Sequence, residues 1–234
     1  MSRRIDGFDV VAFDADDTLW QSEDQFRATE ARFAELVTPF APRGVDVLDA
    51  LHAVERLDIA TQGYGVKAFT LSMVRAAIEM TDGAVTTEVI RELVDLGAGM
   101  LVERVHLLDH VPEVLERVGA EVRLVMITKG DLVHQNRKVS TSGLEHHFSD
   151  IEVVYREKDP AAYARVVGRL GVDADRFLMV GNSVKSDVLP VQAIGGHAVH
   201  VPYHLTWDLE IPDEHDEHVV ELESIADLPE WLGI

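Results

Sequence analysis

Short apolar runs alternate with amphipathic stretches at both ends of the chain, whereas the middle contains amphipathic stretches alone. The first apolar run, residues 8–13, stops at acidic residues, as a strand buried on both faces would. Further runs predict strands at 122–128, 151–155, 177–181 and 197–202, with a short last strand at 218–220. Helices are expected near 112–119, 131–142, 159–170 and 185–194. This alternation predicts an α/β fold, a Rossmann-like parallel sheet with helices on both faces.

The middle of the chain is predicted to be helical throughout. Apolar side chains recur there at spacings of seven, four and three residues, on one helical face: Phe26, Phe33, Val37 and Phe40. Further helices are expected at about 45–60, 66–80 and 86–105, separated by glycine-containing breaks. A block of about 85 residues is too long for a connection, which typically has about 6. We therefore expect an inserted all-helical cap domain at 21–106 and a core domain at 1–20 and 107–234.

Composition restricts the classes of partner. The 234 residues include 21 Lys or Arg and 42 Asp or Glu, a formal net charge of −21. Such a charge repels phosphate backbones and anionic membranes, so no nucleic acid or membrane partner is expected. The chain has no cysteine, which excludes disulfides and cysteine-bound zinc. No apolar run approaches the ~18 residues that span a bilayer, and residues 1–6 lack a signal-peptide core, so we expect a cytoplasmic protein.

Ligands of open parallel sheets bind at the carboxyl ends of the strands, so the residues that follow each strand are candidates for the site. Asp14, Asp16 and Asp17 follow the first strand. Three acids in four positions at a buried strand end need a compensating cation, and Mg²⁺ suits carboxylates together with a phosphate. The alternative is an acidic turn that caps the next helix.

The later strands also end at polar residues. Thr128 and Lys129 follow the second strand, where a hydroxyl and backbone N–H groups at a helix start suit an anion. Lys158 stands at the start of a helix, where the helix dipole disfavours a cation unless an anion binds there. Asn182 and Asp187 follow the fourth strand. Each alone has an ordinary alternative, an N-cap or a solvated charge.

Taken together, these strand-end residues resemble the haloacid dehalogenase (HAD) superfamily of phosphohydrolases. The likeness spans the whole chain and rests on four motifs, which are here Asp14-x-Asp16-x-Thr18, Thr128, Lys158 and Gly181-Asn182-Ser183-x-x-Ser186-Asp187. The helical block lies where the C1-type cap of that superfamily belongs. The resemblance implies that Asp14 is the nucleophile, forming an aspartyl-phosphate, and that Asp16 is the general acid and base.

The resemblance also implies the ligand contacts. Thr128 and Lys158 would hold the phosphoryl oxygens, and Lys129 would either add a charge there or point to solvent. The residues expected at a Mg²⁺ ion are Asp14, Asp16, Asn182 and Asp187. Many relatives have an aspartate in place of Asn182, so the site has one negative charge fewer, which implies a lower affinity for the metal.

An acid at the position of Asp16 favours phosphate esters, because a leaving alcohol needs a proton and a halide does not. We therefore expect a Mg²⁺-dependent phosphatase acting on a small phosphorylated metabolite. Two alternatives stay open: a phosphomutase or phosphotransferase of the same family, and a non-catalytic phospho-receiver module, which is typically shorter and lacks a helical insert.

Four residues of the helical block are candidates for substrate contacts. Tyr64 and Lys67 lie at a break between two of its helices, and the alternative is an exposed turn. Arg27 and Arg75 could meet an anionic substrate or pair with the many acids. The acidic and histidine-containing segment 213–218 is interpreted as a solvated loop rather than a metal site.

Overall fold

The computed structural model describes residues 7–207, 210–211 and 219–234. Within them, a parallel sheet of six strands has the order β3-β2-β1-β4-β5-β6. The strands are β1 (Val10–Phe13), β2 (Arg123–Lys129), β3 (Asp150–Val154), β4 (Phe177–Gly181), β5 (His197–His200) and β6 (Val220–Glu221). The predicted α/β, Rossmann-like fold is confirmed. The segment 213–218, and His218 of the last expected strand, lie outside the described residues.

Alternate side chains of the strands enter two hydrophobic cores, one on each face of the sheet. Val11 and Phe13 of β1 belong to one core, Val10 and Ala12 to the other, and all four are fully buried. The period of two along a strand produces this division. Helices cover both faces, with α5 (Val111–Gly119), α6 (Leu132–Ser142) and α9 (Leu228–Trp231) on one, and α7 (Pro160–Leu170) and α8 (Leu189–Ala193) on the other.

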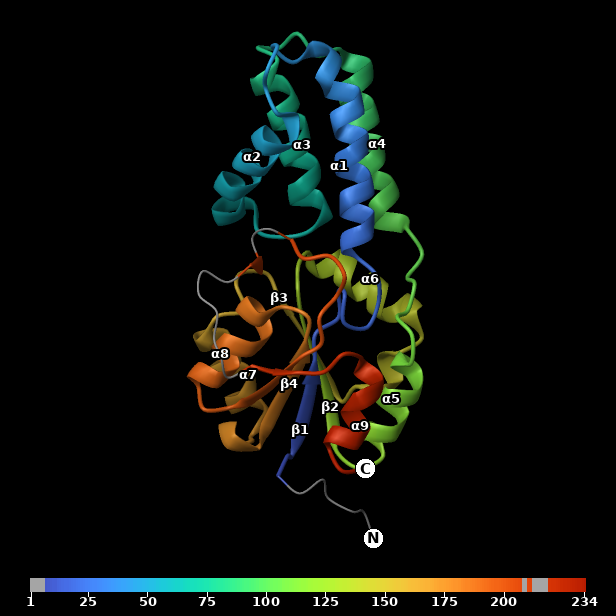
Figure 1. Ribbon diagram of the computed structural model, residues 1–234, viewed down its shortest axis with the longest axis vertical. Helices are drawn as coiled ribbons and strands as arrows, with labels where there is room; N and C mark the ends of the chain where they lie inside the picture. Colours follow the sequence, from blue (N-terminus) through green and yellow to red (C-terminus); the bar gives the residue numbers. More distant parts are fainter. Residues whose placement is uncertain (1–6, 208–209, 212–218) are drawn as a thin grey trace.

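Four helices between β1 and α5 pack on one another above the sheet (Figure 1). They are α1 (Glu23–Val37), α2 (Val47–Gln62), α3 (Val66–Met80) and α4 (Thr87–Val102), called the helical unit below. This unit has a hydrophobic core of its own, which includes Phe33, Leu51, Met73 and Leu93. The four helices fall inside the segment 21–106 that the sequence assigns to a cap. None of the helices in the described ranges is long and apolar enough to span a membrane.

The order of the strands determines where a ligand can bind. The chain moves outward from β1 through β2 to β3, and then continues at β4 on the other side of β1. This reversal makes the carboxyl ends of β1 and β4 the topological switch point, where open α/β sheets bind ligands. The backbone N–H of Asp14, just after β1, donates to Val180 O of β4 at 2.9 Å. The helical unit lies over this edge of the sheet (Figure 1).

Candidate active site

Three of the predicted residues meet at the switch point. Lys158, between β3 and α7, donates from Nζ to Asp14 Oδ1 and, at 2.8 Å, to Asp187 Oδ1. The three residues are buried, with exposed fractions of 3% for Lys158, 6% for Asp14 and 1% for Asp187. An ammonium group therefore lies between two carboxylates in a place that water barely reaches.

The electrostatics of this cluster follow from burial and from the opposed charges. Burial raises the pKa of Asp14 to about 7; Lys158 acts against the rise, and Asp187 adds to it. Burial also disfavours the charge on Lys158, but the two carboxylates outweigh it and raise the pKa of Lys158. Lys158 is therefore a permanent cation, and with both acids ionised the cluster has an excess negative charge that a divalent cation would offset.

The loop after β4 holds Asp187 in place. The backbone N–H of Ser183 donates to Asp187 Oδ2 at 3.1 Å, and the Tyr163 hydroxyl donates to Ser186 O at 3.0 Å. A Cβ on Gly181 would lie 2.2 Å from Asp187 Oδ2, so only glycine leaves room for the carboxylate. This close approach gives a physical reason for the glycine in the last motif.

Thr18 lies between the side-chain oxygens of Asp14 and Asn182. Thr18 Oγ1 lies 3.4 Å from Asp14 Oδ2 and 3.3 Å from Asn182 Oδ1. A hydroxyl has one proton, so Thr18 can donate to only one of these two oxygens. Carboxylate and amide oxygens are ligands that Mg²⁺ accepts. The donor set of Asp14, Asn182 and Asp187 therefore fits a magnesium ion.

Thr128 offers a donor without an acceptor. Its side chain, at the end of β2, is fully buried, and its Oγ1 has no hydrogen-bond partner among the described residues. A buried hydroxyl left unpaired costs about 1–3 kcal/mol. Thr128 lines the same cavity as Asp14 and Lys158, so an anion bound there would satisfy it.

Asp16 has hydrogen-bond partners of its own, outside the buried cluster. Its carboxylate accepts hydrogen bonds from Trp20 Nε1 at 2.6 Å, from Gln135 Nε2 at 2.8 Å and from Lys138 Nζ. Burial alone would raise the pKa of Asp16, but the charge of Lys138 and these hydrogen bonds hold it below its ordinary value. Sequence reasoning missed Lys138 and Gln135, because both lie in the middle of α6 and not at the end of a strand.

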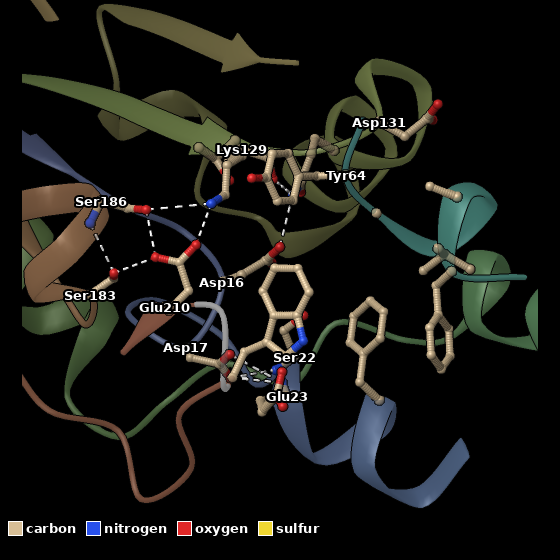
Figure 2. Close-up of a pocket in the computed structure, with 18 of the residues that line it drawn as sticks. Asp16, Asp17, Ser22, Glu23, Tyr64, Lys129, Asp131, Ser183, Ser186 and Glu210 are labelled. Atoms are coloured by element: carbon tan, nitrogen blue, oxygen red, sulfur yellow. Dashed lines mark hydrogen bonds and ion pairs between the residues drawn. The ribbon is translucent and has the colours of Figure 1, made fainter. Parts of the chain in front are cut away.

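The third acid of the first motif has a structural role. Asp17 adopts a left-handed backbone with φ of 61°, and its Oδ1 accepts from the N–H of Ser22 at 2.8 Å and of Glu23 at 3.0 Å. Figure 2 shows these bonds at the start of α1. The alternative that the acids cap the next helix thus holds for Asp17, while Asp14 and Asp16 point elsewhere.

Lys129 lies in the cavity, but its charge is engaged. Its Nζ pairs with Glu210 and lies 4.1 Å from the centre of the Tyr64 ring (Figure 2). Glu210 in turn accepts from the hydroxyl of Ser183 and, at 2.5 Å, from that of Ser186. Lys129 therefore does not point to solvent, and Glu210 competes with any phosphate for it. No strand-end pattern in the sequence indicates Glu210.

The two candidate contacts from the break between α2 and α3 differ. Tyr64 lines the cavity, and its hydroxyl donates to Glu157. Lys67 is half exposed, pairs with Asp131 at 3.0 Å and is not among the described residues that line the cavity. The structure thus brings Tyr64 to the site and leaves Lys67 at its outer edge.

The cavity of about 170 Å³ extends from Asp14 into the helical unit. Arg27 and Arg75 both pair with acids of that unit: Arg27 with Glu23 and Glu30, Arg75 with Asp58 and Glu79. For both arginines the ion-pair alternative therefore holds in the structure.

A model of the haloacid dehalogenase-like hydrolase family matches residues 8–195. Because this match covers most of the chain, the protein belongs to the haloacid dehalogenase-like hydrolases and is an enzyme of that class. A haloacid dehalogenase-like family hydrolase from Xanthomonas campestris has a similar crystal structure, with 38% identity and a TM-score of 0.87. That similarity covers 99% of this chain and 94% of the other.

Two more distant relatives have different activities. N-acylneuraminate-9-phosphatase of Mus musculus is 25% identical over 114 residues, which are 47% of this chain and 46% of the mouse protein. The match thus spans about half the length of that curated relative. L-2-haloacid dehalogenase from Xanthobacter autotrophicus is 18% identical, with a TM-score of 0.65 over 97% of this chain and 98% of the other. At that identity the likeness shows the fold alone.

Proposed function

We propose that the protein is a Mg²⁺-dependent phosphatase that hydrolyses a small phosphorylated metabolite. The observation that carries this proposal is the buried arrangement of Asp14 beside Lys158, with the unpaired hydroxyl of Thr128 in the same cavity. A phosphoryl group in transfer spreads negative charge over its oxygens, and a cation and a free donor stabilise that charge. The partial match to a phosphatase supports the same direction.

Asp14 is the nucleophile in this proposal. One of its carboxylate oxygens forms a bond to phosphorus, and the bond from phosphorus to the ester oxygen breaks, which leaves an aspartyl-phosphate. The departing alcohol oxygen takes a proton from Asp16. Water then attacks phosphorus, Asp16 takes a proton from that water, and phosphate leaves Asp14. Thr128 and Lys158 hold the phosphoryl oxygens throughout.

The environment of Asp16 suits both of its tasks. Hydrogen bonds from Lys138 and Gln135 keep it ionised, which is the form that acts as a base on water. A phosphate ester brought beside Asp16 adds negative charge, and a nearby like charge raises the pKa of a carboxyl. Substrate binding therefore favours uptake of the proton that the leaving alcohol needs.

Asp14, Asn182 and Asp187 would hold the magnesium ion, with the backbone carbonyl of Asp16 as a further expected ligand. When bound, the ion offsets the negative charges of the phosphoryl oxygens and of Asp14, so that the two can approach. We further propose that the segment 21–106 acts as a cap, because α1, α2 and α3 contribute to the walls of the cavity. A cap that excludes water from the first step also strengthens the electrostatic contacts inside.

A panel of phosphate monoesters, incubated with the enzyme and Mg²⁺, tests this function by release of inorganic phosphate. We expect turnover of at least one ester, its loss on addition of EDTA, and its loss in Asp14→Asn. Asp95→Asn, at an exposed position of α4, is the matched control and should retain the wild-type rate. An Asp14→Asn variant with normal activity would refute the mechanism. An isomerised product without free phosphate would indicate a mutase instead.

A further inference from the structure

The cavity that contains Asp14 has an acidic far end inside the helical unit. Glu23 and Glu30 of α1 and Glu55 and Asp58 of α2 all line it. Their exposed fractions are 8%, 4%, 7% and 4%, so each is more than nine-tenths buried. Buried carboxylates are rare unless they are paired, which makes their partners informative.

Three of the four acids have partners within the helical unit. Arg27 pairs from Nε with Glu23 at 3.0 Å and from Nη1 with Glu30 at 3.2 Å. Arg75 pairs from Nη1 with Asp58 at 2.5 Å. Two arginines thus pair with three of the four carboxylates, and Glu55 is the fourth acid.

Glu23 and Glu55 each have a buried oxygen without a hydrogen-bond partner among the described residues, and that of Glu23 lies 3.0 Å from Arg27 Nε. The buried oxygen of Glu55 is Oε2. Side-chain atoms of Glu30, His52 and Glu55 that could bind a metal ion lie within 4.8 Å of one another. His52 Nε2 and Glu30 Oε1 are joined by a hydrogen bond of 2.9 Å. Burial raises the pKa of Glu55 to about 7; His52 acts against the rise, and Glu30 adds to it. A carboxylate in this position is stabilised by any cation that enters the cavity.

The walls next to these acids suit an organic cation better than a bare metal ion. Phe26 and Phe69 line the cavity with their ring centres 5.1 Å apart, and Ile59 and Val66 add aliphatic surface. Aromatic faces attract ammonium and guanidinium groups, and apolar surface accommodates the carbon atoms that carry them.

We propose that this end of the cavity binds a positively charged amino group of the substrate, with Glu55 as its hydrogen-bond acceptor. The substrate is then a phosphate monoester whose alcohol portion carries an alkylammonium group. An ammonium group has three hydrogen-bond donors and no acceptor, and the carboxylates that line this end of the cavity are acceptors. The inference rests on the proposed function, since phosphoryl binding at Asp14 anchors the other end of the molecule.

The test compares aminoalkyl phosphates of increasing chain length with their N-acetyl derivatives, which have no charge on nitrogen. The enzymes are wild type, Glu55→Gln and the control Glu35→Gln, an exposed acid of α1 that pairs with Arg32 on the surface. We expect wild type to prefer the amines. Glu55→Gln should lower kcat/KM for the amines about 10- to 100-fold, the effect of losing a hydrogen bond to a charged group, and leave the N-acetyl esters unchanged. Glu35→Gln should match wild type on both.

Failure of this inference and failure of the proposed function give different results. Equal rates on amines and N-acetyl esters, or an equal effect of Glu55→Gln on both, would overturn the amino-group subsite and leave the phosphatase intact. If no ester releases phosphate, calorimetry with the free amino alcohols still tests the subsite, and binding that Glu55→Gln weakens would support it. Binding of Mn²⁺ and Zn²⁺ is also measured for Asp14→Asn and for the double variant with Glu55→Gln. If Asp14→Asn binds either ion and the double variant does not, the acids form a metal site and the proposal is overturned.

Discussion

Replacing Lys158 by methionine removes the cation between Asp14 and Asp187 and keeps a similar volume. The variant leaves two buried carboxylates without the ammonium that bonds to both. Removing one partner of a buried ion pair costs about 3–5 kcal/mol. Melting temperatures of proteins of this size fall by about 2–4 °C per kcal/mol, so the expected decrease is about 6–20 °C.

The loss of stability in Lys158→Met should increase as the pH rises. The pKa of folded Asp14, about 7, lies above its ordinary value of 3.8, so the folded state binds the proton more tightly than the unfolded state. Ionisation of Asp14 therefore reduces stability as pH rises from about 4 to 7. Without Lys158 the pKa of Asp14 rises further, and the difference between wild type and Lys158→Met should widen from pH 5 to pH 8.

Urea unfolding at the two pH values, without Mg²⁺, measures this difference. The control is Lys67→Met, which breaks a half-exposed pair with Asp131 and should cost about 0–1 kcal/mol. Adding Asp187→Asn to Lys158→Met removes one of the two unpaired charges and should recover part of the loss. The reasoning is refuted if Lys158→Met unfolds within 1 kcal/mol of wild type at pH 8, or if the difference is the same at pH 5.

Three further variants test the site. Asp16→Asn should lower kcat/KM, which reports the steps up to release of the alcohol, about 10²–10⁴-fold on alkyl phosphates but much less on p-nitrophenyl phosphate, whose leaving group needs no proton; equal losses of kcat/KM on the two esters would contradict the acid role. Gly181→Ala puts a Cβ 2.2 Å from Asp187 Oδ2. Because overpacking destabilises a protein, the variant should lower the free energy of unfolding by about 1–3 kcal/mol, and wild-type stability in urea would contradict this. Asn182→Asp adds a carboxylate and should lower the Mg²⁺ concentration for half-maximal activity, and a higher requirement would argue against Asn182 as a ligand.

The strands could be predicted because apolar runs bounded by polar residues are typical of buried parallel strands. The run at 177–181 coincides with β4. The predicted strand at 197–202 instead ends at His200, because its last partner in the ladder is Gly181, the end of β4. In place of the single helix expected at 185–194, the structure has a π-helical turn, Val184–Val188, followed by α8. Pro190 lies in the first turn of α8, where its missing N–H is tolerated.

The residues that contact the predicted site residues could not be predicted from apolar runs and strand ends. Lys138, which pairs with Asp16, is a polar position on an amphipathic helix, and such positions face solvent more often than a cavity. Glu210 contacts Lys129 across 81 positions of sequence. Glu55 lies on α2 among other acids, and only the packing of the helical unit over the sheet turns it toward the cavity. The carboxyl ends of parallel strands lie along one edge of the sheet, whereas these contacts depend on how helices and loops are placed over that edge.

Trapping the covalent intermediate tests the central claim most directly. The enzyme is mixed with Mg²⁺ and a turned-over phosphate ester, quenched during turnover and treated with borohydride, which reduces an acyl phosphate to an alcohol. Peptide mass spectrometry should find homoserine in place of Asp14, in amounts that fall to background in enzyme quenched without substrate. Reduction at another acid, or an unmodified Asp14 while phosphate is being released, would contradict the account.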